Sequence, residues 1–143
     1  MASYVIDASV GFKWLFPEEF EEQAELLISS SDTLWVPDLF FSEITNTLWK
    51  KVRLENISLA KAKSSLLALK SFDLQSVISL DLQMAALEIA TIVNQSTYDS
   101  LYIALAVQKE TQMITADKRF YNSLQNTPFA DYVSWIGHDT IHV

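Results

Sequence analysis

The stretch SYVIDASVGFKWLFP, residues 3–17, contains the first strand-to-helix unit that the sequence predicts. Its first five residues are an apolar run of strand formers that is too short for a helix, which predicts a buried strand ending in Asp7. The following residues favour a helix, with Ser9 as its expected N-cap and Pro17 as its stop. A buried strand followed at once by a helix is the repeating unit of folds with parallel sheets.

The same alternation continues along the chain. "TLWV" at residues 33–36 predicts a second strand, and Pro37 is expected to open the long helix that follows. Strands that alternate with helices form βαβ units, so the predicted fold class is α/β, with a largely parallel sheet covered by helices on both faces. The other expected elements are helices at 18–30, 37–56, 58–72, 81–95 and 95–108, strands at 76–80 and 112–117, and an apolar run at 132–137.

Length and composition limit the architecture further. The chain has 143 residues, and half of them are hydrophobic, so we expect residues 1–143 to form a single domain around one core. Its apolar runs are shorter than the ~20 residues of a membrane span, and its start lacks the basic region of a signal peptide. These features predict a soluble, cytoplasmic protein.

The charge and the absence of cysteine narrow the classes of function. A formal net charge of -8 argues against broad electrostatic adhesion to nucleic acid or to anionic membranes. It does not exclude a nucleic-acid enzyme, because a carboxylate site reverses its local sign once it holds divalent cations. With Cys 0, any metal would have to be bound by oxygen atoms or by the two histidines.

Four acidic residues are expected to meet at one edge of the sheet. Asp7 and Asp117 each follow a predicted strand. Asp99 lies in the first turn of the helix at 95–108, and Glu43 in an early turn of the helix at 37–56. The functional crevice of an open parallel sheet lies beyond the carboxyl ends of its strands, so all four can face one edge.

Each acid taken alone has an ordinary explanation as a strand end, a helix start, a solvated helix position or a turn. Unit charges ~4 Å apart repel by roughly 4 kcal/mol per pair at an effective dielectric constant of 20, so a cluster needs a cation. Oxygen ligands suit Mg²⁺ or Mn²⁺. Such ions activate water and stabilise a phosphodiester during displacement, which points to metal-assisted phosphodiester hydrolysis.

Four segments, in chain order, carry a resemblance to a known family: "VIDASVGFKWLFPEE", "VPDLFFSEITNTLWK", "TYDSLYIALAV" and "MITADKRF". Together they resemble a PIN domain, and specifically the VapC-like toxin ribonucleases of type II toxin-antitoxin systems. The resemblance implies a three-layer α/β/α fold with a central, mainly parallel sheet. It also implies an Mg²⁺- or Mn²⁺-dependent endoribonuclease acting on RNA, a homodimer, and neutralisation by a cognate antitoxin protein.

The resemblance also assigns roles to individual residues. Ser9 and Thr115 are placed near the first and last acids, and Asn46 on the face of Glu43, where they would orient ligands or the scissile phosphate. Among the acids, Asp7, Asp99 and Asp117 are expected to bind the principal ion. Glu43 is expected to bind it directly, through a water molecule or through a second ion.

Basic residues are candidates for phosphate contacts. Lys118 and Arg119 lie beside Asp117, and Lys13 lies in the helix after Asp7; a solvated position is about as well supported for each. The basic cluster at residues 50–53 lies at the C-terminal end of its predicted helix, where the helix dipole favours positive charge. This is the preferred explanation of the cluster, and contact with RNA is the alternative.

Other chemistries have weaker support. His138 and His142 lie in a polar C-terminal tail, where exposure is the ordinary explanation, although their spacing could suit a metal. A receiver-like or phosphatase-like phosphotransfer domain is an alternative, but "VIDAS" lacks the second acid two residues after Asp7 that an aspartate-nucleophile phosphatase needs. A catalytically silent module that binds RNA or protein is a further alternative, and it has no reason to keep four convergent carboxylates.

Overall fold

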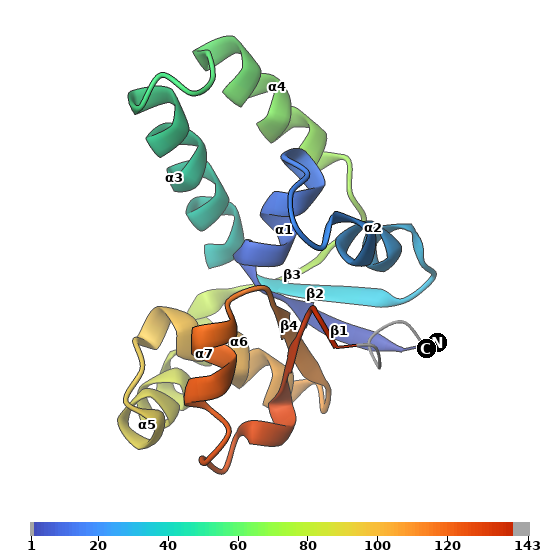
Figure 1. Ribbon diagram of the computed structural model, residues 1–143. Helices are drawn as coiled ribbons and strands as arrows, with labels where there is room; N and C mark the ends of the chain where they lie inside the picture. Colours follow the sequence, from blue (N-terminus) through green and yellow to red (C-terminus); the bar gives the residue numbers. More distant parts are fainter. Residues whose placement is uncertain (1, 139–143) are drawn as a thin grey trace.

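Within the described residues, 2–138 of the computed structural model, five strands form one sheet. The strands lie in the order β3-β2-β1-β4-β5, and every neighbouring pair is parallel (Figure 1). The predicted α/β class with a parallel sheet is therefore confirmed. The bounds of the strands are β1 Ser3–Ile6, β2 Thr33–Pro37, β3 Gln75–Val77, β4 Gln112–Thr115 and β5 Val133–Trp135.

Helices cover both faces of the sheet and complete the three layers. In Figure 1, α1 to α4 lie on one side of the sheet, with α3 and α4 projecting as a hairpin, and α5 to α7 lie on the other. No helix within residues 2–138 is long and apolar enough to cross a bilayer. The helices are α1 Ala8–Leu15, α2 Glu21–Ser29, α3 Leu39–Arg53, α4 Leu59–Lys70, α5 Gln83–Val93, α6 Thr97–Gln108 and α7 Lys118–Ser123, with short 3₁₀ turns at Ser79–Leu82 and Ala130–Tyr132.

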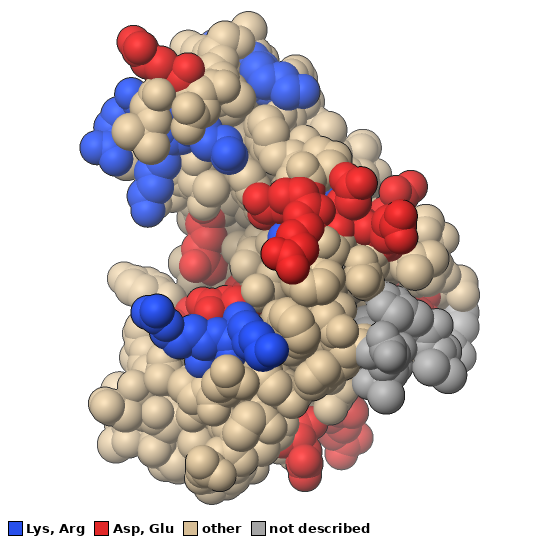
Figure 2. Space-filling view, viewed as in Figure 1, with Lys and Arg blue, Asp and Glu red and all other residues tan. Residues whose placement is uncertain are grey.

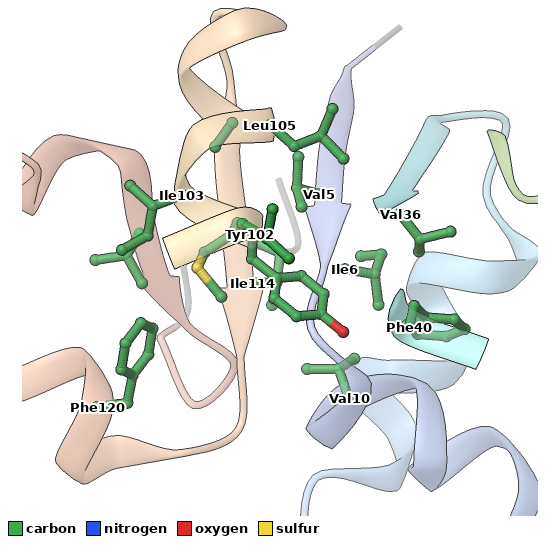
Figure 3. Packing of buried hydrophobic residues seen from close by; sticks show 14 of the residues in the cluster. Val5, Ile6, Val10, Val36, Phe40, Tyr102, Ile103, Leu105, Ile114 and Phe120 are labelled. Atoms are coloured by element: carbon green, nitrogen blue, oxygen red, sulfur yellow. The ribbon is translucent and has the colours of Figure 1, made fainter. Parts of the chain in front are cut away.

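The core is centred on β1, β4 and α6 (Figure 3). Val5 and Ile6 of β1 have no exposed surface, and every residue of α6 from Ser100 to Ala106 is buried. This helix contacts β1, β2 and β4 on one side and α5 on the other, which explains why it is apolar around its whole circumference. A helix held in this way is a rigid support for side chains at its N-terminal end.

The opposite layer is packed closely at the start of α1. A Cβ atom added to Gly11 would lie 2.5 Å from the Phe40 ring of α3, so only glycine allows this approach of the two helices. The approach brings α3, which carries Glu43, close to the helix that begins directly after Asp7.

Several predicted boundaries are wrong. Pro37 ends β2 instead of opening a helix. Proline has no backbone N–H to donate, and the end of a strand tolerates the loss of that hydrogen bond. The helix predicted from residue 18 begins at Glu21, after Phe20 adopts a left-handed conformation with φ 66°. The strand predicted at 76–80 is β3, which ends at Val77 and is followed by a 3₁₀ turn.

Two further expectations near the strand ends are corrected. Ser9 does not cap α1: the N-cap position is Asp7, whose carbonyl accepts hydrogen bonds from Val10 and Gly11, and Ser9 lies inside the first turn. Residues 118–123, for which the sequence predicted no helix, form the short helix α7.

Candidate active site

The four predicted acids come from segments that meet where the order of the strands changes direction. β1 lies beside β4 at the centre of the sheet, while β2 and β3 extend to one side of β1 and β5 extends beyond β4. Asp7 directly follows β1, and its N–H donates to the Ile114 carbonyl of β4 at 3.1 Å. Such a switch point leaves a crevice beyond the carboxyl ends of the two strands.

Two hydroxyl groups hold the carboxylate of Asp7. Ser9 Oγ donates to Asp7 Oδ2 at 2.7 Å, and Thr115 Oγ1 donates to the same oxygen at 2.8 Å. The two hydroxyls are themselves fixed, because they accept the N–H groups of Ala116 and Asp117 at 3.0 and 3.1 Å. The network occupies Oδ2 and leaves Oδ1 of Asp7 for a ligand.

Glu43 reaches the same crevice from α3. Its side chain is half-buried, and its Oε1 accepts a hydrogen bond from the hydroxyl of Tyr102 at 2.5 Å. Tyr102 lies on α6, in the opposite helical layer, so this bond connects the two layers beside the site. Tyr102 is absent from the residues predicted from sequence, although its position three residues after Asp99 puts both on one helix face.

Asp99 and Asp117 are placed by helix N-termini. Ser96 caps α6 by accepting the Asp99 N–H at 3.1 Å, so the half-buried Asp99 carboxylate stands in the first turn. Asp117 caps α7, with Oδ1 accepting the Phe120 N–H at 3.1 Å, and its side chain is exposed. In both places a favourable helix dipole accounts for part of the preference for an acid.

Burial and mutual repulsion raise the pKa of three of these acids. Burial is the largest cause for Asp7, Glu43 and Asp99. The nearby charge of Asp99 also raises the pKa of Asp7, and the charges of Asp7 and Asp99 raise that of Glu43. Asp117 raises the pKa of Asp99 in the same way. The four acids therefore feel one another's charge.

Two of the acids, Asp7 and Glu43, line a cleft of about 440 Å³, whose α3 side is formed by Glu43, Asn46, Thr47 and Lys50. The four residues on α3 share a helix face because their spacing follows the helical repeat. Among residues 2–138, Asp99 and Asp117 are not part of the lining of the cleft. Figure 2 shows acidic side chains recessed between basic groups on the α3–α4 hairpin and basic groups near α7. The full lining is Asp7, Ala8, Ser9, Phe12, Lys13, Glu18, Glu43, Asn46, Thr47, Lys50 and Ala116.

Cations near the cleft do not neutralise the acids. In the part of the chain that the structure describes, the single ion pair joins the buried Lys13 to Glu18 at 3.3 Å. Lys118 and Arg119 are exposed on the first turn of α7, and the Lys118 ammonium lies 4.4 Å from the centre of the Trp135 ring. The site therefore retains an excess of negative charge.

The donor set fits a hard divalent cation by its chemistry. It consists of carboxylate oxygens. Within residues 2–138, the side-chain hydrogen bonds of Asp7, Glu43 and Asp117 go to a single carboxylate oxygen of each residue. No three His, Asp or Glu side chains within residues 2–138 converge tightly enough to form a ready metal-binding group. An ion here would complete its shell with water and phosphate oxygens, as Mg²⁺ usually does.

The remaining candidates are placed as follows. Lys51 of the basic cluster lies over the Phe12 and Phe16 rings, and the Arg53 guanidinium lies 4.9 Å from the centre of the Trp49 ring. These contacts give both residues a packing role. His138 packs edge-on against Tyr121 and Trp135, and His142 lies outside the described residues.

Comparisons with known proteins identify the family of this chain. The model of the PIN domain family matches residues 4–123. The curated protein Ribonuclease VapC3 of Pyrobaculum aerophilum is 31% identical over 117 residues, which are 80% of this chain and 89% of that protein.

Two solved structures share the fold at low sequence identity. PAE2754 from Pyrobaculum aerophilum matches with a TM-score of 0.70 and 20% identity, covering 94% of this chain and 90% of that one. VapBC2 from Rickettsia felis, bound to a DNA fragment from its promoter, matches with a TM-score of 0.65 and 10% identity, covering 93% and 98%. With the family model spanning most of its length, this chain belongs to the PIN domain family.

Proposed function

We propose that the protein is a metal-dependent endoribonuclease and the toxin of a toxin-antitoxin pair. One observation carries the proposal: four carboxylates from four segments are electrostatically coupled at the switch point of a parallel sheet, with no cation paired to any of them in residues 2–138. The name of the relative from Pyrobaculum aerophilum, a ribonuclease, supports RNA as the substrate.

The proposed cofactor is Mg²⁺ or Mn²⁺. Asp7, Asp99 and Asp117 would hold the principal ion, and Glu43 would bind it directly, through water or through a second ion. When bound, such an ion supplies an activated water molecule and stabilises charge on the phosphate. Asn46 stands one helical turn after Glu43 and would orient ligands or the scissile phosphate.

The proposed reaction is in-line hydrolysis. The oxygen of a water molecule attacks phosphorus and the water gives up a proton, the bond from phosphorus to O3′ breaks, and O3′ takes up a proton from solvent, so the products carry a 5′-phosphate and a 3′-hydroxyl. Ser9 and Thr115 hold Asp7 Oδ2 in place during this step, so that Oδ1 stays directed to the cleft. Lys13, Lys118 and Arg119 are proposed phosphate contacts, of which Lys13 would first have to exchange its bond to Glu18.

The proposed partners are RNA, a cognate antitoxin and a second copy of the chain, acting in the cytoplasm as one domain. Large exposed apolar side chains support protein partners. Trp49 and Leu59 are 55% and 58% exposed on the α3–α4 hairpin, and Met84 and Leu87 are 75% and 58% exposed on α5. Patches of this kind on a soluble protein often mark interaction sites.

The test needs no knowledge of the RNA target. Total cellular RNA is incubated with the wild type, with Asp99→Asn and with Asp81→Asn, in Mn²⁺, in Mg²⁺ and in chelator, and new 5′-phosphate ends are mapped. Asp81 is an exposed acid on the 3₁₀ turn and serves as the matched control.

We expect discrete new ends that need metal, persist in Asp81→Asn and vanish in Asp99→Asn. Products ending in a 2′,3′-cyclic phosphate would contradict the hydrolytic mechanism. If metal binding is confirmed in the same preparation and no new ends appear, the proposed nuclease activity is wrong.

A further inference from the structure

We propose that Tyr102 is a positioning residue that fixes Glu43 and limits this acid to one oxygen directed at the cleft. The inference rests on the proposed function, because it concerns how the chain presents a ligand to a divalent cation. It adds to the site a residue that has no charge and does not line the cleft.

The hydroxyl of Tyr102 is a fixed point. Its side chain is 1% exposed, and its ring lies among Ile6, Val10 and Ile114 (Figure 3). The neighbouring residues of α6 are also buried, so neither the ring nor the helix can move far to follow Glu43.

Glu43, by contrast, would be mobile without this bond. It stands on α3, and its side chain has three rotatable bonds and is only half-buried. In the described part of the chain, the hydrogen bond that its carboxylate accepts is the one from Tyr102, at 2.5 Å. A short hydrogen bond from a buried hydroxyl to a carboxylate is among the stronger ones, so it selects one conformation of Glu43.

The hydrogen bond gives the two carboxylate oxygens of Glu43 different roles. Oε1 is bound to Tyr102 on the core side, which leaves Oε2 to face the cleft that Glu43 lines. Asp7 has the same division, since both hydroxyls bind its Oδ2. Because Asp99 and Tyr102 are three residues apart on α6, one rigid helix face supplies an acid and positions another.

A structural role alone would predict a different result. If Tyr102 merely fills the core, Tyr102→Phe would change stability and leave the affinity for metal as it is. If Tyr102 positions Glu43, the variant keeps the ring and the packing but releases the carboxylate. Outer-shell hydrogen bonds of this kind typically contribute 10–100-fold to metal affinity or activity.

The experiment compares Tyr102→Phe with Tyr98→Phe. Tyr98 lies on the same helix, is 64% exposed and borders Asp99 in sequence, so it is a matched control. Mn²⁺ binding is measured by calorimetric titration, and kcat and KM are measured on an RNA identified as a substrate. We expect Tyr102→Phe to bind Mn²⁺ at least about 10-fold more weakly. We also expect kcat to fall at saturating RNA while KM for RNA is unchanged, and Tyr98→Phe to match the wild type.

A double-mutant cycle with Glu43→Gln shows whether the effect passes through Glu43. In that background Tyr102→Phe should have little further effect on Mn²⁺ affinity, because the group that it positions is already changed. Equal Mn²⁺ affinity of Tyr102→Phe and the wild type would overturn the inference. Full additivity of the two substitutions would overturn it as well.

A second measurement covers the case in which Tyr102→Phe does not fold. The wild type is labelled with fluorotyrosine, and its ¹⁹F signals are assigned by substituting the other tyrosines one at a time. Mg²⁺ should shift the Tyr102 signal and leave the Tyr98 signal in place; an unmoved Tyr102 signal in protein that binds Mg²⁺ refutes the inference. If the wild type itself binds no divalent ion, the proposed function fails instead, so the two failures are distinguishable.

Discussion

At the scale of single residues, the site combines acids that destabilise one another with hydroxyls that hold them in place. Ser9 and Thr115 bind Asp7, and Tyr102 binds Glu43, each from the protein side of the carboxylate. Hydrogen bonds of this kind lower the pKa of a carboxyl group, but burial outweighs them, and the pKa values of Asp7 and Glu43 remain raised. Burial and repulsion of these charges cost stability in the metal-free chain, and the proposed divalent cation would offset that cost.

The pH dependence of stability follows from these raised pKa values. An acid with a higher pKa in the folded chain binds protons more strongly when folded. The free energy of unfolding therefore falls as pH rises from the unfolded pKa of about 4 through the raised folded value. In chelator we expect this loss for the wild type, and a smaller loss for Asp99→Asn, which lacks one raised acid.

The check is urea denaturation of both proteins between pH 4 and pH 8. At neutral pH Asp99→Asn should be the more stable by on the order of 1 kcal/mol, after solvent screening of a half-exposed carboxylate. Asp81→Asn, with an exposed acid, serves as the control. If the free energy of unfolding of the wild type and of Asp99→Asn changes with pH in the same way, the charge of Asp99 does not destabilise the folded chain.

The sequence predicted the placement of the four acids because their position along the chain determines their position in space, while their role in metal binding stays a prediction. Asp7 and Asp117 follow neighbouring parallel strands, and Asp99 and Glu43 stand at the starts of helices, so local patterns suffice to bring them to one edge. Tyr102 could not be found in this way. Its partner, Glu43, is 59 residues distant in sequence, and no periodicity reports which buried hydroxyl will face which acid.

At the scale of elements, prediction depended on length and on the strength of the pattern. The helix α6 was predicted because a run of apolar residues marks it; of the two capping candidates in the sequence, Ser96 and Thr97, the structure has Ser96 at the N-cap. The short helix α7 was missed, because six residues carry too little periodicity to distinguish a helix from a turn. The sequence also placed Pro37 wrongly, at the start of a helix instead of the end of β2. Proline is common at both positions, so the residue alone does not distinguish them.

The short helix α7 gives Arg119 a testable role. The Lys118 ammonium is held against the Trp135 ring, whereas Arg119 is exposed beside Asp117 and is the freer of the two cations. In chelator, where RNA stays intact, we expect Arg119→Gln to weaken binding of single-stranded RNA several-fold. The slope of log affinity against log salt should fall by about 0.7, the value for one phosphate contact on a single strand.

The control for this prediction is Lys70→Gln, which removes an exposed cation at the end of α4 that does not line the cleft. Binding is measured by fluorescence anisotropy across a range of KCl concentrations. If Arg119→Gln and the wild type have the same slope of log affinity against log salt, Arg119 does not contact an RNA phosphate. Equal losses in both variants would mean that general charge, rather than a local contact, supports binding.

At the scale of the whole molecule, an acidic protein is proposed to act on an acidic polymer. The formal net charge is -8, and the cleft proposed for RNA is lined by Asp7 and Glu43, two of the acids that feel one another's charge. Without a cation, the cleft should repel phosphate more than the rest of the surface does, because its charges lie close together and are partly buried. The location of the charge, rather than its total, would then limit RNA binding.

Two double variants with the same change in net charge separate location from total. Asp7→Asn/Glu43→Gln removes two acids that line the cleft, and Asp81→Asn/Glu88→Gln removes two from exposed positions on the 3₁₀ turn and α5. In chelator and low salt we expect the cleft variant to bind RNA about 3–10-fold more tightly than the wild type, and the surface variant to change little. Raising KCl to 1 M should erase the difference, since the screening length falls to ~3 Å. If the surface variant gains as much as the cleft variant, the total charge sets RNA affinity, and a divalent ion in the cleft would not be needed to admit the substrate.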